Sequence, residues 1–77
     1  MKLEDALTLV ENELASAKAK FPPFASAHEG YAVLAEEVDE LWDAVKVKQS
    51  ELTRPAALRR EAIQVAAMAL RFLVDVC

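Results

Sequence analysis

Two pairs of polar residues lie one helical turn apart in two separate segments of the chain. Glu37 and Glu40 belong to the segment LAEEVDELWDAV, and Glu61 and Gln64 belong to the apolar segment REAIQVAAMAL. Each pair has i, i+3 spacing, which places both side chains on one face of an α-helix. The like charges of Glu37 and Glu40 repel each other and lose hydration beside apolar surface, so we expect a compensating group. Ligands that are all oxygen suit a hard divalent cation such as Mg²⁺ or Mn²⁺.

The two pairs are expected to meet when the segments fold back on each other. In an antiparallel helical hairpin, residues equidistant from the turn lie side by side. Glu40 with Glu61, and Glu37 with Gln64, share one midpoint inside the predicted turn. Three carboxylates and one amide would then converge on a partly buried wall. The alternative interpretation is that EExxE is a solvated helix surface, as it is in most helices.

Hydrophobic periodicity predicts an amphipathic helix over about residues 2–20. Its apolar positions follow the helical 3–4 spacing and are Leu3, Ala6, Leu7, Val10, Leu14 and Ala17. The helix ends at KFPPF, because Pro22 and Pro23 cannot continue an α-helix and they restrict the residue before them. This segment is therefore a joint between the first two helices.

A second helix is predicted over about residues 26–49. It opens with SAHE, where Ser26 caps the helix and Glu29 reaches back to form a capping box. The central apolar stripe of the helix is expected to face the core. It consists of Leu34, Val38, Leu41 and Val45, flanked by Tyr31, Ala35 and Trp42.

A third helix is predicted over about residues 54–76, with Thr53 or Arg54 as its cap and Pro55 in its first turn. This helix is apolar around almost its whole circumference, so it is expected to lie in the middle of an assembly. Two other helices of one short chain do not surround it. We therefore expect a homo-oligomer, a dimer or a tetramer, whose core is completed by the same helix of a partner. The alternative is a monomer with an exposed apolar face.

Composition predicts a single all-α domain over residues 1–77. The net charge of −4 and the lack of a basic stripe argue against a nucleic-acid partner. The only cysteine is Cys77, so no intrachain disulfide forms, and a reducing compartment is expected. The first residues are too acidic for a signal peptide, and the longest apolar run is shorter than a membrane span. These features predict a cytoplasmic protein with no membrane partner.

The chain resembles the MazG-like, all-α nucleoside triphosphate pyrophosphohydrolases over about residues 28–75. Their signature is EExxE on one helix and ExxD on the next, and LAEEVDELWDAV followed by REAIQVAAMAL is similar to it. The resemblance implies a helical bundle assembled as a dimer or tetramer. It also implies hydrolysis of an NTP or dNTP between the α- and β-phosphates, giving a monophosphate and pyrophosphate, as in nucleotide house-cleaning.

The resemblance also implies roles for the acidic residues. Glu37, Glu40 and Glu61 are the expected metal ligands, and Glu36, the first residue of EExxE, is a weaker candidate. A bound Mg²⁺ or Mn²⁺ would bridge the carboxylates to the phosphates and polarise the phosphoryl oxygens. A glutamate that is not fully committed to the metal would take the proton of the attacking water, and Glu37 and Glu40 are the two candidates.

Gln64 is the departure from the family pattern, which has aspartate at this position. Its amide oxygen is a possible fourth ligand that adds no charge, so weaker metal binding or fewer ions are expected. The alternative function is therefore a catalytically weak or inactive MazG-like oligomer that binds nucleotide or a protein. Another interpretation of Gln64 is a buried amide that hydrogen-bonds across the oligomer core. Family members often continue into a further helix, so some substrate contacts are expected either to be missing or to come from a neighbouring subunit.

Arg71, Lys48 and Trp42 are the candidate substrate contacts. Arg71 lies about two turns beyond Gln64, and it either meets phosphate or pairs with Asp75 at i+4. Lys48 is either solvated or a phosphate contact. Trp42 is a candidate for stacking on a base, although aromatic residues at helical spacing more often pack in a core. The other aromatic candidates are Phe21, Phe24 and Tyr31.

Overall fold

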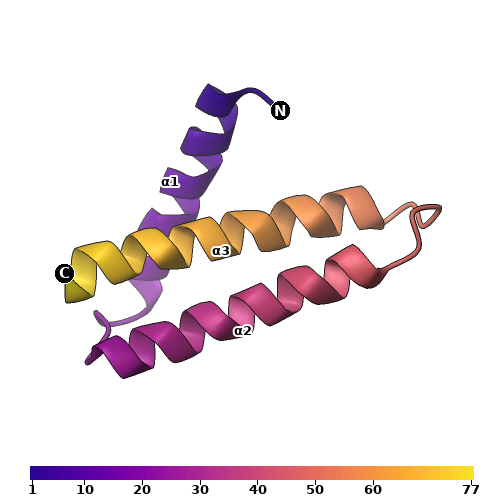
Figure 1. Ribbon diagram of the computed structural model, residues 1–77. Helices are drawn as coiled ribbons and strands as arrows, with labels where there is room; N and C mark the ends of the chain where they lie inside the picture. The colour runs from indigo at the N-terminus through magenta and orange to yellow at the C-terminus, as the bar shows by residue number, and fades with distance from the viewer.

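The computed structural model describes all 77 residues and contains three α-helices and no strand. They are α1 (Leu3–Lys20), α2 (Ala27–Lys46) and α3 (Arg54–Val76). The helices α2 and α3 form an antiparallel hairpin, and α1 crosses α3 (Figure 1). The predictions of an all-α fold and of three helices are confirmed.

The start of α2 follows the predicted capping pattern. The Ser26 hydroxyl oxygen accepts a hydrogen bond from the Glu29 N–H at 3.1 Å. The Glu29 carboxylate reaches back one residue further than a standard capping box, because it accepts from the Ala25 N–H at 3.2 Å. Both bonds satisfy backbone donors where the chain leaves the proline joint.

The end of α2 lies at Lys46 instead of about residue 49. Val47 is extended, with ψ of 143°. The Arg54 guanidinium donates a hydrogen bond to the Val45 carbonyl at 3.2 Å, so a carbonyl of the last helical turn is satisfied by a side chain from α3. Thr53 precedes α3 at the cap position without a side-chain capping bond.

The core is small and lies where α1 crosses α3. Its fully packed members are Ala17, Phe24, Ala67 and Met68, against which Val10, Leu14, Val33, Leu34, Phe72 and Val76 are packed. Gly30 is needed for this packing, because a Cβ atom at that position would lie 2.7 Å from Cδ2 of Phe72. No large side chain is completely buried, so the core of one chain is sparse.

Only the second half of α1 is packed. Val10, Leu14 and Ala17 contact the core, whereas Leu3 and Leu7 are 75% and 52% exposed. The first turns of α1 extend beyond α3 (Figure 1). The predicted apolar stripe of this helix is therefore buried only over its second half.

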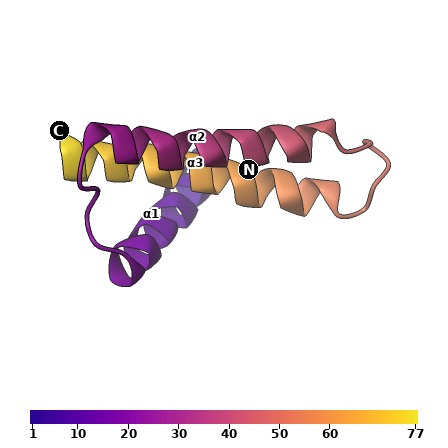
Figure 2. The same ribbon diagram turned by 90° about the horizontal axis from the view of Figure 1, so that it is seen from below.

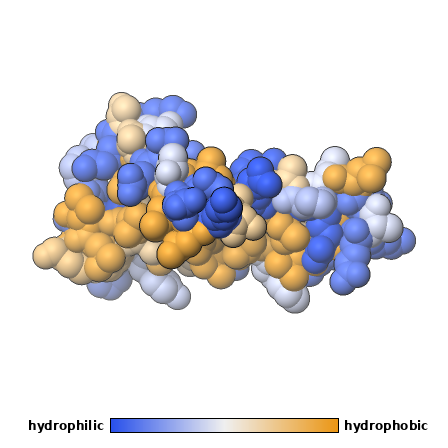
Figure 3. All heavy atoms as spheres, turned by 90° about the horizontal axis from the view of Figure 1, so that it is seen from above, coloured by the Kyte–Doolittle hydropathy of each residue, from blue (hydrophilic) through white to orange (hydrophobic).

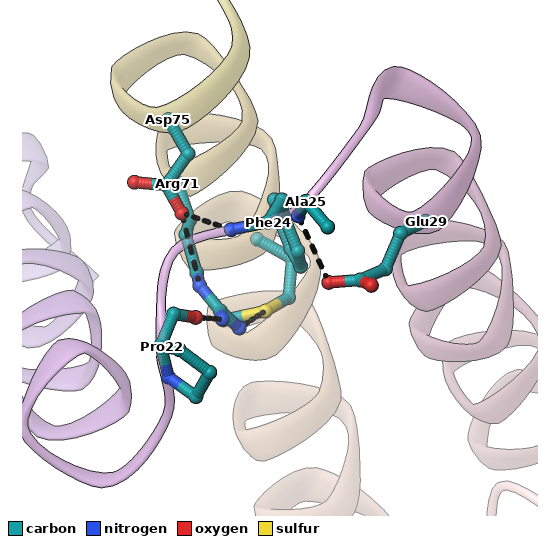
Figure 4. Close-up of polar contacts among 7 residues, drawn as sticks. Pro22, Phe24, Ala25, Glu29, Arg71 and Asp75 are labelled. Atoms are coloured by element: carbon teal, nitrogen blue, oxygen red, sulfur yellow. Dashed lines mark hydrogen bonds and ion pairs between the residues drawn. The ribbon is translucent and has the colours of Figure 1, made fainter.

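The joint between α1 and α2 is fixed to α3 by a buried arginine (Figure 4). Nη2 of Arg71 donates to the Pro22 carbonyl at 2.7 Å, and Nε of Arg71 lies 3.4 Å from Oδ2 of Asp75. The same Asp75 oxygen accepts from the Phe24 N–H at 3.0 Å, and the guanidinium lies 4.0 Å from the centre of the Phe24 ring. The predicted Arg71–Asp75 ion pair is confirmed, and it sets the position of α1.

One face of the hairpin is bare. In Figure 2, the C-terminal half of α1 projects from one side of the hairpin, and among the other two helices α1 packs against α3. Residues with 4–3 spacing on α2 leave apolar surface exposed, namely Tyr31 (69%), Val38 (47%), Trp42 (57%) and Val45 (39%). Figure 3 shows the molecule from the side opposite to that of Figure 2, and apolar side chains also lie exposed there between groups of hydrophilic ones. The prediction that Val38 and Val45 face the core is wrong, because α1 packs on the other side of the hairpin.

The helix α3 is apolar, but it lacks the combination of length and hydrophobicity of a membrane-spanning helix. None of the three helices combines the length and the hydrophobicity needed to cross a bilayer.

Candidate metal site between α1 and the helical hairpin

Three carboxylates from two helices converge on one side of the hairpin. Oxygen atoms of Glu37 and Glu40 from α2 and of Glu61 from α3 all lie within 4.8 Å of one another. The convergence expected from the shared midpoint of these residues is therefore present. Their roles as metal ligands and as a base remain predictions.

The cluster lies on the wall of an open cavity of about 650 Å³ between α1 and the hairpin. This volume is within the usual range of small-molecule sites. The cavity is lined by Glu13, Ser16, Ala17 and Lys20 of α1, by Phe21, Pro22 and Phe24 of the joint, by Glu29, Val33, Glu37 and Glu40 of α2, and by Arg60, Glu61, Gln64, Met68 and Arg71 of α3. All three helices therefore contribute to it.

Glu37 is the most perturbed acid of the chain. Burial, then the charge of Glu40 and its hydrogen bond to Glu37, and then the charges of Glu61 and Glu36, together raise the pKa of this carboxyl group from 4.5 to about 7. Its Oε2 atom is inaccessible to solvent and has no hydrogen-bond partner. A buried polar atom without a partner is uncommon in folded proteins, and it indicates a missing ligand or a missing proton.

The residues of the cluster fit a hard divalent cation. Three carboxylates supply oxygen ligands, and the unpartnered Oε2 atom of Glu37 would gain a partner. No histidine or thiol lies in the cluster, which favours Mg²⁺ or Mn²⁺ over Zn²⁺. A cation would also remove the mutual repulsion that holds the pKa of Glu37 high.

Gln64 lines the same cavity, and α1 holds its amide. Nε2 of Gln64 donates a hydrogen bond to Oε1 of Glu13 at 2.7 Å, so the amide bonds within its own chain. Sequence reasoning missed Glu13. The residue flanks the apolar stripe of α1, three positions from Val10 and four from Ala17, but its partner is 51 residues away. No local pattern distinguishes it from the other acids of that helix.

Two basic residues of the cavity were also missed. Arg60 and Lys20 line it from α3 and α1. Nε of Arg60 lies 3.1 Å from Oε1 of Glu61, and the Arg60 side chain is 66% exposed. Arg60 is therefore exposed but already paired with Glu61, and Lys20 is exposed, whereas the guanidinium of Arg71 is buried and committed to Asp75 and the joint.

Three of the candidates from the sequence lie outside the cavity. Trp42 belongs to the bare face, where Nζ of Lys46 lies 5.9 Å from the centre of its ring. Lys48 is exposed in the turn between α2 and α3, and Glu36 is exposed on α2. The aromatic residues that line the cavity are Phe21 and Phe24.

Comparisons with protein-family profiles, with curated proteins and with solved structures found no match to this chain. The resemblance to the MazG-like enzymes therefore depends on the residues of the hairpin alone.

Proposed function

We propose that this protein is a metal-dependent nucleoside triphosphate pyrophosphohydrolase of the MazG-like kind. It would cleave an NTP or dNTP between the α- and β-phosphates to give a monophosphate and pyrophosphate. One observation carries the proposal. Three carboxylates from α2 and α3 meet within 4.8 Å of one another beside a cavity of about 650 Å³. This arrangement is what recognition of a triphosphate through a cation requires, because a carboxylate cluster alone repels phosphate.

Glu37, Glu40 and Glu61 would hold Mg²⁺, or Mn²⁺, in this cavity. When bound, such an ion would supply positive charge for holding the triphosphate and for polarising a phosphoryl oxygen. The protein fixes the three carboxylates on two packed helices, so they need no rearrangement when substrate arrives. Either Glu37 or Glu40, whichever is less committed to the cation, takes the proton of the attacking water.

The other cavity residues suit the remaining parts of a nucleotide. Arg60 and Lys20 line the wall, and we favour them over Lys48 for contact with the phosphates. Phe21 is 57% exposed and lines the same cavity, so its ring is available to stack on a base. Arg71 acts indirectly, because it holds the joint that carries Phe21 and Phe24.

The protein is further proposed to be a homo-oligomer that pairs through the bare face of the hairpin. A folded monomer of 8.5 kDa is expected to expose about 4,650 Å². This chain exposes 5585 Å², an excess of about 900 Å², which is close to the ~800 Å² that each partner buries in a standard interface. The 4–3 spacing of Tyr31, Val38, Trp42 and Val45 is that of a helix packed against another helix.

The second candidate function is a catalytically weak or inactive oligomer that binds nucleotide or a protein partner. The observation that favours it is Gln64, which replaces the aspartate of the family pattern with an uncharged amide. Under this alternative, nucleotide would bind in the cavity, and no pyrophosphate would form with either metal.

Pyrophosphate release from a panel of ribo- and deoxyribonucleoside triphosphates, with Mg²⁺ and then Mn²⁺, tests the proposal. We expect release from at least one nucleotide, and loss of that release in Glu61→Gln. Asp39→Asn is the matched control, since it removes the same charge from an exposed position on α2. Release that persists in Glu61→Gln would refute the assigned site. No release across the panel would favour the second candidate.

A further inference from the structure

Gln64 and Glu13 form the only side-chain hydrogen bond between α1 and α3. Nε2 of Gln64 and Oε1 of Glu13 are 2.7 Å apart, and the bond is partly buried. Both side chains line the cavity that contains the carboxylate cluster. Gln64 lies one helical turn from Glu61, so the pair adjoins the cluster.

The direction of this hydrogen bond follows from the chemistry of the two groups. A carboxylate only accepts, so the amide nitrogen of Gln64 must face Glu13. No group in the chain donates to the amide oxygen, which is left free for a cation or water. The amide thus holds a carboxylate of α1 in the same cavity, outside the group of three carboxylates whose oxygen atoms lie within 4.8 Å of one another.

We propose that Glu13 is a fourth acidic residue of the cation site, positioned by Gln64. The Glu13 carboxylate supplies the negative charge that an aspartate at position 64 would carry and that Gln64 lacks. This inference rests on the proposed function, because the cation is the one assigned above to Glu37, Glu40 and Glu61. In this chain, the acidic part of the site comes from all three helices, and α1 takes part in binding the cation as well as in forming the cavity wall.

A consequence separates this inference from a simple loss of one ligand. A carboxylate introduced at position 64 would face the Glu13 carboxylate at hydrogen-bonding distance without a proton between them. Gln64→Glu alone should therefore loosen the contact between α1 and α3. Exchange of both residues, Glu13→Gln with Gln64→Glu, should restore the bond with donor and acceptor reversed.

The test measures binding of Mg²⁺ and Mn²⁺ by isothermal titration calorimetry, together with the melting temperature without metal. We expect Glu13→Gln to weaken cation binding about 10-fold or more, the usual effect of removing a group that supports metal ligands. Glu11→Gln is the matched control, because it removes the same charge from an exposed position on α1. Gln64→Glu should lower the melting temperature, and the exchanged variant should recover both the melting temperature and most of the lost affinity.

The outcomes separate the inference from the proposed function. If Glu13→Gln binds the cation as tightly as the wild type and Glu11→Gln, Glu13 is a structural residue and the inference is wrong, while the metal site stands. If the wild type binds neither cation, both the inference and the metal basis of the proposed function are overturned. If a single variant does not fold, the exchanged variant decides, and its failure to bind the cation like the wild type contradicts the inference.

Discussion

Removal of the charge of Glu37 should stabilise the metal-free protein. Burial and three neighbouring acids raise the pKa of this carboxyl group from 4.5 to about 7. The folded state therefore binds a proton more tightly than the unfolded state does. The contribution of Glu37 to stability is greatest below about pH 4.5, where Glu37 is protonated in both states. This contribution falls as the pH rises towards 7. In that range the unfolded state has already released the proton of Glu37, whereas the folded state either keeps it or carries a Glu37 carboxylate that the neighbouring acids repel.

The size of the effect follows from this difference in pKa. Each unit is equivalent to about 1.4 kcal/mol, so the full shift corresponds to at most about 3.4 kcal/mol above pH 7. Solvent and ions screen a cavity that is open to water, so we expect about 1–2 kcal/mol in practice. For a chain of this size, that change raises the melting temperature by about 4–15 °C.

Thermal unfolding of wild type and Glu37→Gln, followed by circular dichroism in EDTA at pH 4, 6 and 8, measures the difference. The variant should be more stable at pH 8 and equal to the wild type at pH 4, since glutamine resembles the protonated acid. Added Mg²⁺ should then stabilise the wild type and leave the variant almost unchanged. Asp39→Asn, an exposed charge removal on the same helix, should show neither effect. A Glu37→Gln variant with the same stability at pH 8 as the wild type would refute the reasoning.

Three further changes probe the elements around the site. Arg71→Met should destabilise the protein by about 3–5 kcal/mol, because it leaves Asp75 charged and buried without its partner, and Asp75→Asn in the same chain should recover part of the loss in a urea unfolding experiment. Gly30→Ala should cost about 1–3 kcal/mol, measured in the same way, because the new Cβ atom would overlap Phe72. Val38→Glu should convert the oligomer to a monomer in analytical ultracentrifugation and leave Mg²⁺ affinity unchanged, since the residue is on the bare face; a monomeric wild type would contradict the oligomer proposal.

The hairpin was predictable because its information is local. Pro55 and the capping residues Ser26 and Glu29 limit the turn and the helix ends, and two helices joined by a short turn have little choice except to pack antiparallel. The pairing of equidistant residues then brings Glu40 to Glu61. The predicted end of α2, at about residue 49, was too late, and the reason is again a contact near the turn. The Arg54 side chain donates a hydrogen bond to the Val45 carbonyl, which a longer helix would have bonded to one of its own backbone N–H groups.

The position of α1 was not predictable, because distant contacts determine it. Nothing near Pro22 in the sequence indicates that its carbonyl accepts from Arg71, 49 residues away. That contact places α1 on one side of the hairpin and leaves Val38 on the other, so the burial of the α2 stripe was assigned to the wrong side. Glu13 was missed for the same reason, since its place at the site depends on the crossing of α1 over α3.

The two faces of the hairpin differ in chemistry, and we therefore expect them to meet different partners. On the side of α1, carboxylates crowd together and one buried oxygen has no partner, so that face is unfavourable until a cation or proton arrives. On the bare side, exposed apolar residues favour another apolar surface. The proposed cation site on one face and the proposed self-association surface on the other share only the packed helices between them. Cation affinity and oligomeric state should therefore vary independently in variants confined to one face, and a change at Val38 that weakened Mg²⁺ binding would show that the partner chain completes the site.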